Sequence, residues 1–442
     1  MAQMDLLEII AFLWSKVSWR AVFWGLGLQF VIGLFVIRTE PGLTAFKWLG
    51  DQVQIFLNYT IAGSSFVFGN DLVTQAFAFQ ALPIIVFFSS VMSVLYYLGI
   101  MQWIIIKIAW IMQITMGTSP TETLSVAGNI FVGQTEAPLL IRPYLQEMTK
   151  SEIHAVMTGG FATIAGSVMG AYISFGIDAA SLISASVMAA PCALGLAKLS
   201  YPETCKTKFK TKDQIKVDSS GEQNILEAAS NGASASIALV ANIAANLIAF
   251  LAILDFINAA LKWLGGMVGY PEITFEMICS YVFMPVTFMM GIPYEESFVA
   301  AELIGTKLFL NEFLAYERLS KLKNNRLNGL PPVSDSERQW ISVRSETICT
   351  YALCGFANFT SLGIMIGGLW LLFVPPLDCL DVFRNSVFNS TFSNITTCCT
   401  DLFGSAINNG TAVHFTGSWS NVMNATLYFT SCCDLYNNTM CF

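Results

Sequence analysis

The chain has 442 residues, of which 55% are hydrophobic and only 12% are charged, and its mean hydropathy is +0.60. Soluble domains carry about 25% charged residues, so this composition excludes an ordinary water-soluble protein and places most of the chain in lipid. The net charge of −8 excludes little, because charge in a membrane protein is interpreted loop by loop. The 34 Phe residues show none of the alternation of a β-barrel. We therefore expect a multi-pass, all-α membrane protein, surrounded by the lipid bilayer and without a nucleic-acid partner.

Residues 1–117 are predicted to form N-terminal scaffold helices. Trp19 to Ile37 is apolar and long enough to cross a bilayer once, and it is expected to act as its own insertion signal. Thr44 to Val67 is amphipathic and broken by glycines, which is typical of an interfacial or short buried helix. Ala76 to Met116 is almost continuously apolar and predicts one span followed by a second helix that begins near Met101.

Residues 118–199 contain polar side chains within an otherwise apolar region. Thr118 to Tyr144 carries carboxylates, amides and a proline, and such groups are tolerated at membrane depth only against protein or a water-filled cavity. This predicts a re-entrant helical hairpin. Ile153 to Gly176 follows and is rich in small residues that let helices approach closely, and Ala179 to Leu199 is a further span.

Residues 200–233 are predicted to be a cytoplasmic linker, because five lysines lie between positions 206 and 216. Residues 234–374 then return to apolar sequence. They are expected to hold a span over Ser234 to Gly265 and a second hairpin, with Phe275 to Met290 and Val299 to Tyr316 as its arms. The last stretch, Ile341 to Val374, is broken by charged residues and glycine, which indicates a discontinuous helix.

Residues 375–442 differ from the rest of the chain. They contain six cysteines and a single basic residue, Arg384. They also contain five Asn-x-Ser/Thr acceptors for glycosylation, which are Asn389, Asn394, Asn409, Asn424 and Asn437. This pattern predicts an extracellular, disulfide-bonded and glycosylated tail.

The same polar arrangement occurs twice. Gly133-Gln134-Thr135-Glu136 lies in the first predicted hairpin and precedes a small-residue helix, and Asn311-Glu312 lies in the second and precedes the broken helix. Two such halves resemble the inverted repeats of secondary transporters, which bind substrate and ions between the repeats near the membrane midplane.

Two of the intramembrane carboxylates, Glu136 and Glu312, are predicted to be functional, because a buried charge costs about 2.5–3.5 kcal/mol on insertion scales. Glu346 is expected to be structural and neutralised by Arg344, and the roles of Glu122 and Glu302 are left open. A carboxylate accepts from two hydroxyls at once, and amides both donate and accept. These groups suit a polyhydroxylated substrate with a nucleobase-like edge.

Three segments carry a specific family resemblance: Asn129 to Pro138, Asn311 to Tyr316, and Gly355 to Asn358. In this order and with compatible spacing, they resemble the signature segments of the concentrative nucleoside transporter family, from about Trp19 to Leu369. The resemblance implies a sodium-coupled importer of purine and pyrimidine nucleosides at the plasma membrane. It also implies a homotrimer in which each protomer has a scaffold and a mobile transport domain, with sodium as the coupling ion and no cofactor.

The resemblance also implies roles for individual residues. The substrate would be bound by Gln134, Thr135, Glu136, Val168, Glu312, Phe356, Asn358 and Ser361. The first three contact the base, Val168 lines the pocket and Phe356 packs on the base, while the last two join Glu312 at the ribose. Sodium would be bound by Asn129, Val132, Thr163 and Ile164, partly through backbone oxygens.

The sequence departs from the family after Gly367-Gly368-Leu369. Family members continue with a basic loop and one more transmembrane helix, whereas here Trp370 to Pro375 leads almost directly to Cys379. The final helix is therefore expected to be missing, which leaves the side of the tail open. An alternative is a non-transporting, truncated isoform that assembles with full-length subunits. A membrane-embedded hydrolase would need a nucleophile or metal motif, and none is present, so no catalytic residue is predicted.

Overall fold

The computed structural model describes residues 17–75, 77–205, 207–208, 222–270, 272–334 and 337–373, with positions 402, 405–408, 413–415, 429 and 432–433. The chain separates into two units. The first comprises Met1–Leu140 and Thr149–Leu362, and the second comprises Ile141–Met148 and Gly363–Phe442. All five predicted glycosylation acceptors lie outside the described residues. Cys432 and Cys433 are each disulfide-bonded.

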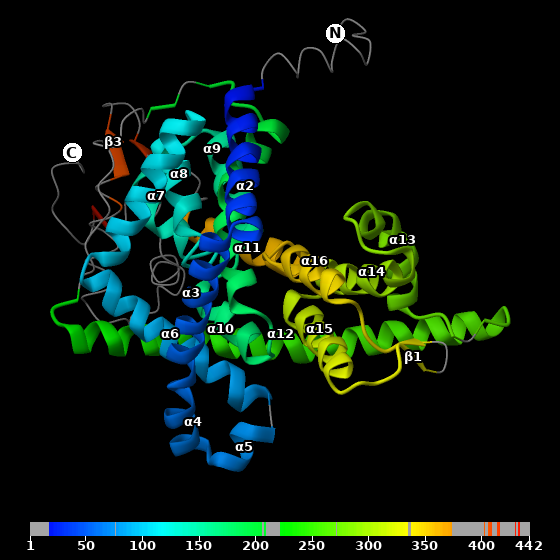
Figure 1. The fold of residues 1–442 in the computed structure, drawn as a ribbon. Helices are drawn as coiled ribbons and strands as arrows, with labels where there is room; N and C mark the ends of the chain where they lie inside the picture. The colour runs from blue at the N-terminus through cyan, green and yellow to red at the C-terminus, as the bar shows by residue number, and fades with distance from the viewer. Residues whose placement is uncertain are drawn as a thin grey trace, which may run out of the picture. The chain divides into compact units, whose positions relative to one another are not determined.

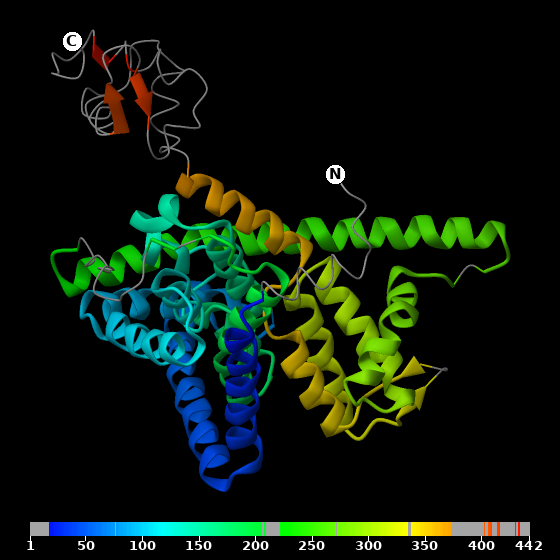
Figure 2. The same cartoon turned by 90° about the horizontal axis from the view of Figure 1, so that it is seen from above.

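The N-terminal region of the first unit begins with two long helices that form a hairpin (blue in Figure 2). Helix α2 spans Trp19–Arg38, as the apolar run predicted. Helix α3 spans Glu40–Asn58 and is capped by Thr39, whose side chain accepts a hydrogen bond from the backbone N–H of Gly42. Two short helices follow, α4 over Thr60–Phe68 and α5 over Asn70–Gln75.

The apolar region up to Met116 forms two helices. Helix α6 spans Phe77–Tyr97 and α7 spans Ile100–Met116, with a bend of 80° between them. Gly99 lies at the bend with φ +75°, a left-handed conformation that glycine adopts without steric cost. The predicted second helix near Met101 is thus confirmed.

Two series of elements then share one order: a helix, a tight turn, a second arm, and a helix that is broken in the middle. The first series comprises α8 (Pro120–Gly128), the 3-10 helix η1 (Ala137–Glu147), α9 (Lys150–Ala162) and α10 (Gly166–Ser174). The second comprises α14 (Tyr294–Phe309), α15 (Glu312–Leu327), α16 (Val343–Leu353) and α17 (Phe359–Phe373).

Three further helices and two hairpins of short strands complete the description. Helix α11 spans Ala179–Ser200, α12 spans Ile225–Met267, and α13 spans Phe275–Met289. Helix α12 is a single 43-residue helix (green in Figure 1) that begins inside the range predicted as a linker. The strands are β1 (Val333–Ser334), β2 (Glu337–Arg338), β3 (Ala406–Asn408) and β4 (Val413–Phe415).

The described residues contain four helices, α9 and α10 being taken together, that are long and apolar enough to cross a membrane. The number rises to six if each sharply bent pair counts as one span. This agrees with the predicted multi-pass helical protein. The five-part domain division remains a prediction.

The predicted second hairpin needs a correction. A bend of 117° between α13 and α14 confirms the turn at Pro293, but the predicted arm from Val299 to Tyr316 is wrong. Helix α14 ends at Phe309, and the side chain of Asn311 accepts a hydrogen bond from the backbone N–H of Leu314, which starts a new helix at Glu312. Arg318 of α15 reaches back to Glu302 of α14 at 2.8 Å, so these two helices are antiparallel. The Asn311-Glu312 pair therefore lies at the turn between α14 and α15.

The two broken helices meet at their breaks. Gly355 lies in the break between α16 and α17 with φ +106°. A Cβ atom at this position would lie 2.8 Å from the carbonyl oxygens of Phe161 and Ala162, at the end of α9. A buried cluster that includes Tyr172, Phe313 and Phe356 surrounds this crossing. Only glycine allows the two backbones to approach so closely.

We expect Gly355→Ala to destabilise the protein by about 2 kcal/mol or more, because alanine combines an unfavourable positive φ with a backbone clash. The thermal midpoint of the detergent-purified chain should fall by several degrees. Gly27→Ala is the matched control, since nothing lies within 4 Å of a Cβ at that position. A midpoint for Gly355→Ala equal to that of the control would contradict the close approach.

Candidate functional site

Glu312 is the centre of a buried polar cluster in the first unit. It is the first residue of α15, and it is only 4% exposed. The hydroxyl of Tyr172 on α10 donates to Oε1 at 3.0 Å, and the amide Nδ2 of Asn358 donates to Oε2 at 2.7 Å. An ionised carboxylate has lone pairs for about four donors, so it can still accept from hydroxyl groups of a ligand.

Asn358 links this carboxylate to the start of α17. Its Oδ1 accepts a hydrogen bond from the backbone N–H of Ser361 at 2.7 Å, so it caps the helix while its amide nitrogen faces Glu312. Ser361 is 5% exposed and Phe356 is 9% exposed. The structure thus brings three predicted substrate residues, Glu312, Asn358 and Ser361, into one hydrogen-bonded cluster.

Helix α10 connects this cluster to the tip of the first hairpin. Positions 165, 168 and 172 lie on one face of the helix, because they are three and seven residues apart. Gly133 of the hairpin tip packs beside Ala165, with 3.7 Å between a Cβ built on Gly133 and the Cβ of Ala165, and Tyr172 holds Glu312 at the other end. The two ends are about 10 Å apart along the helix. Val168 lies between them and is buried in the hydrophobic core.

The three predicted residues of the hairpin tip differ in their surroundings. Gln134 is buried, and its Oε1 has no hydrogen-bond partner. Thr135 is half-buried, while Glu136 is exposed and accepts a hydrogen bond from the backbone N–H of Gly133 at 3.1 Å. These residues lie outside the Glu312 cluster. An amide oxygen that is buried without a partner costs free energy, so Gln134 favours a ligand or water at this position.

The predicted sodium residues lie where the first hairpin meets the break between α9 and α10. The backbone N–H of Gly166 donates to the carbonyl oxygen of Phe131 at 3.0 Å, which joins the two segments. Asn129 is fully buried, and both atoms of its side-chain amide lack a partner. Thr163 and Ile164 form the break and are buried as well. Neutral oxygens from an amide, a hydroxyl and free carbonyls are the ligands that a hard cation prefers, so these residues fit sodium.

The structure adds three residues that the sequence analysis missed. Tyr172 holds Glu312, and Ser125 places an unpaired and fully buried hydroxyl one helical turn before Asn129. Lys307 is a buried lysine that donates to the carbonyl oxygens of Ala352 and Cys354. Lys307 has a visible signal, because a lysine in an apolar segment is uncommon. Tyr172 and Ser125 have no such signal, since both residue types are ordinary in a small-residue helix.

The three other carboxylates that the sequence analysis considered are ion-paired. Glu122 pairs with Lys198 at 2.7 Å, and both side chains are buried. Glu302 pairs with Arg318 at 2.8 Å. Glu346 was correctly expected to be neutralised, but Arg344 was the wrong partner: the guanidinium of Arg326 on α15 makes this contact, because α15 continues as a helix beside α16.

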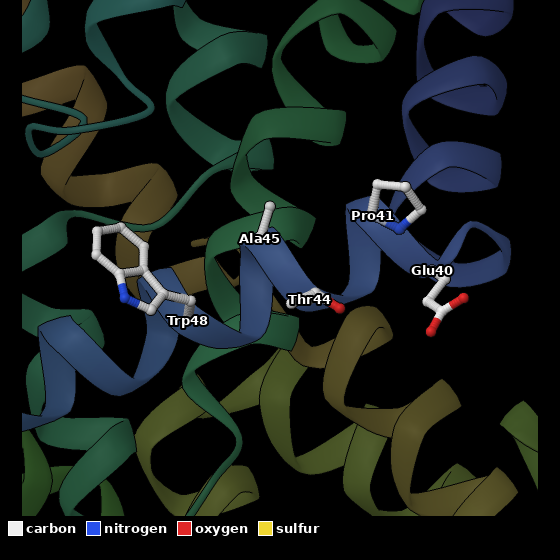
Figure 3. A pocket seen from close by; sticks show the side chains of 5 residues that line it. All are labelled: Glu40, Pro41, Thr44, Ala45 and Trp48. Atoms are coloured by element: carbon white, nitrogen blue, oxygen red, sulfur yellow. The ribbon is translucent and has the colours of Figure 1, made fainter.

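Two hollows in the described residues lie away from these side chains. One is a shallow groove of about 490 Å³ along a single face of α3, lined by Glu40, Pro41, Thr44, Ala45 and Trp48 (Figure 3). The other, of about 260 Å³, is polar and is lined in part by Lys47, Asp51, Asp178 and Lys323. Neither contains a predicted site residue. The Glu312 cluster is closed over by its neighbours in this conformation, so a ligand requires movement to enter.

Three family models match consecutive parts of the chain. They are described as Na+ dependent nucleoside transporter N-terminus (residues 6–71), Nucleoside recognition (78–179) and Na+ dependent nucleoside transporter C-terminus (181–400).

Among relatives, sodium/nucleoside cotransporter 2 of Rattus norvegicus is 57% identical over 97% of this chain and 70% of its own length. Sodium/nucleoside cotransporter 1 of Homo sapiens is 56% identical over 96% and 69%. The alignment with the rat protein covers 464 positions, more than the 442 residues of this chain, so the relative has residues without a counterpart here.

Among solved structures, CNTnw in an inward-facing, substrate-bound state has a TM-score of 0.73 at 36% identity and covers 81% of this chain and 84% of its own. A single-residue variant of CNTnw in the intermediate 2 state has a TM-score of 0.74 at 35% identity, with coverages of 81% and 85%.

We expect Lys198→Met to destabilise the protein by about 3–5 kcal/mol, because it leaves the buried Glu122 carboxylate without its partner. The double variant Lys198→Met, Glu122→Gln should recover most of that loss. Thermal midpoints of the four members of the cycle measure the coupling. If the double variant is no more stable than Lys198→Met alone, the pair is not coupled as the geometry indicates.

Proposed function

The chain belongs to the Na+ dependent nucleoside transporter family, and we propose that it imports purine and pyrimidine nucleosides by sodium-coupled alternating access. Its fold matches a transporter that has been solved in inward-facing, outward-facing and intermediate states. Its own buried polar groups lie where two broken helices meet, the arrangement in which secondary transporters bind substrate and ions.

The observation that carries this proposal is the Glu312 cluster. Ribose presents neighbouring hydroxyl groups, and one carboxylate can accept from both. Tyr172 and Asn358 already hold Glu312 by hydrogen bonds, so the acceptor is fixed in direction before a ligand arrives. Glu312, Asn358 and Ser361 are therefore assigned to the ribose.

The base is assigned to the other end of the α10 face. Gln134, Thr135 and Glu136 contact its edge, Val168 lines the pocket, and Phe356 packs on the ring. The unpaired Oε1 of Gln134 supports this, because an amide can donate to one base and accept from another by presenting a different atom. This adaptability is consistent with acceptance of both purines and pyrimidines.

Sodium supplies the driving force and is assigned to Asn129, Val132, Thr163 and Ile164. The unpaired amide of Asn129 supports this site. Inward movement of one charge is worth about 2.3 kcal/mol per 100 mV of membrane potential, which is enough to accumulate a neutral nucleoside many-fold.

The cellular location, the oligomeric state and the modifications of the tail are part of the same proposal. It functions at the plasma membrane as a homotrimer of protomers with a scaffold and a mobile transport domain, and its tail is glycosylated and disulfide-bonded. The alternative is a non-transporting isoform that assembles with full-length subunits. The rat relative has residues without a counterpart here, which leaves room for an absent helix. Uptake by the chain expressed alone distinguishes the two.

We expect Glu312→Gln to lower saturable uridine uptake by about 100-fold or more, because the amide replaces one of the acceptor oxygens with a donor. Uptake should be measured in cells and corrected for surface protein by biotinylation. Glu317→Gln is the matched control on the same helix, since Glu317 pairs with the exposed Lys321. Uptake by Glu312→Gln close to that of the control would refute the assignment.

We expect Asn129→Ala to raise the sodium concentration for half-maximal uptake by about tenfold, since it removes a ligand from the cation site. The KM for uridine at saturating sodium should change much less. Asn328→Ala, at the exposed end of α15, serves as the control. An unchanged sodium dependence in Asn129→Ala would exclude this residue as a ligand.

A further inference from the structure

The second repeat contains a buried lysine that the proposed transport cycle does not use. Lys307 lies in the last turn of α14 and is only 8% exposed. Its Nζ donates to the carbonyl oxygens of Ala352 at 3.0 Å and Cys354 at 3.3 Å. Both oxygens lie at the end of α16, where that helix breaks before α17. Burial of an ammonium group costs free energy of desolvation, so a lysine at this position must make interactions that offset this cost.

The contacts of Lys307 complete the hydrogen bonding of a helix end. The last carbonyl groups of any α-helix have no partner within the helix. At the end of α16, the hydroxyl of Tyr316 donates to the carbonyl oxygen of Thr350 at 2.9 Å, and the backbone N–H of Cys354 donates to that of Tyr351 at 3.3 Å. Lys307 donates to the carbonyl oxygens of Ala352 and Cys354. Donors from the protein itself thus reach four carbonyl oxygens at the end of α16, those of Thr350, Tyr351, Ala352 and Cys354.

The corresponding break in the first repeat is different. Helix α8 holds the place that α14 holds in the second repeat, but its sequence from Pro120 to Gly128 has no basic residue. It presents instead the hydroxyl of Ser125, and the amide of Asn129 follows at its end. Both groups are fully buried, and neither has a partner. Neutral oxygen groups therefore surround the first break, whereas a cation is built into the second.

We propose that Lys307 is a tethered cation at the second break and occupies there the place that a free sodium ion occupies at the first. This inference rests on the proposed function, because it compares the lysine with the coupling ion. Lys307 is a positioning residue: it fixes the end of α16 and, through it, holds Phe356 and Asn358 beside Glu312. Its positive charge also attracts the buried carboxylate of Glu312, to which it makes no ion pair within contact distance. One free sodium ion per nucleoside is then sufficient.

The direct test removes the lysine side chain by substitution and then supplies a small ammonium ion in solution. Lys307→Ala leaves a space lined by carbonyl oxygens that matches the lost aminoalkyl group. The thermal midpoint of the purified full-length variant should fall, and ethylammonium should restore most of the loss. Tetramethylammonium carries the same charge but no N–H donor and should not restore it. The thermal midpoint of Lys307→Arg should stay close to that of the parent without added ethylammonium. Lys321→Ala, at an exposed lysine on α15, should not respond to ethylammonium.

Two outcomes of this test overturn the proposal. One is a Lys307→Ala midpoint equal to that of the parent, and the other is equal restoration by both ions. This measurement needs no transport activity. A chain that fails to transport nucleosides therefore refutes the proposed function but leaves the test of Lys307 intact.

A second measurement uses the unaltered chain, so it decides the question even if Lys307→Ala cannot be purified. The charge and the uridine that enter cells expressing this chain are measured together, and their ratio should be one elementary charge per nucleoside. A ratio of two would overturn the proposal, because a second free cation would then be bound. In Lys307→Ala, sodium can enter the vacated space. The Hill coefficient for sodium activation should then rise from about 1 to about 2.

Discussion

The close contact between the two helix breaks is the constraint on which the rest of the site depends. Gly355 lies against the end of α9 with no room for a Cβ atom, so the free backbone groups of both breaks come together in the middle of the first unit. Neither break is stable alone in an apolar environment, because unpaired carbonyl and N–H groups there are costly. Each needs polar side chains from a hairpin beside it. Asn129, Gln134 and Glu312 are such side chains.

The two repeats meet this need in different ways. The second repeat uses permanent groups: Asn358 caps α17, Lys307 and Tyr316 take the carbonyl oxygens at the end of α16, and Tyr172 holds Glu312 from the other repeat. The first repeat leaves Asn129 without a partner. A protein whose ion site is complete only with the ion bound has a physical reason to change conformation when the ion arrives, which is what coupling requires.

Much of this arrangement was predictable from sequence, and the exceptions have physical causes. Apolar length and polar interruptions predicted the spans, the second helix near Met101 and the break within Ile341 to Val374. The helix start at Glu312 was missed because an apolar run continues across it, although Asn311 is a good N-cap residue. Tyr172 and Ser125 were missed because their roles depend on contacts between elements distant in sequence. The partner of Glu346 was wrong because closeness in sequence favoured Arg344, whereas the packing of α15 beside α16 brings Arg326 to the carboxylate.

On this proposal, the chain alone couples sodium entry to nucleoside accumulation. The most direct measurement places the purified chain in proteoliposomes and follows radiolabelled uridine and adenosine under an inward sodium gradient, with potassium in place of sodium as the control. We expect transient accumulation of both nucleosides above equilibrium with sodium and none with potassium. Correctly inserted protein that accumulates neither nucleoside, or that does so equally in potassium, would contradict it.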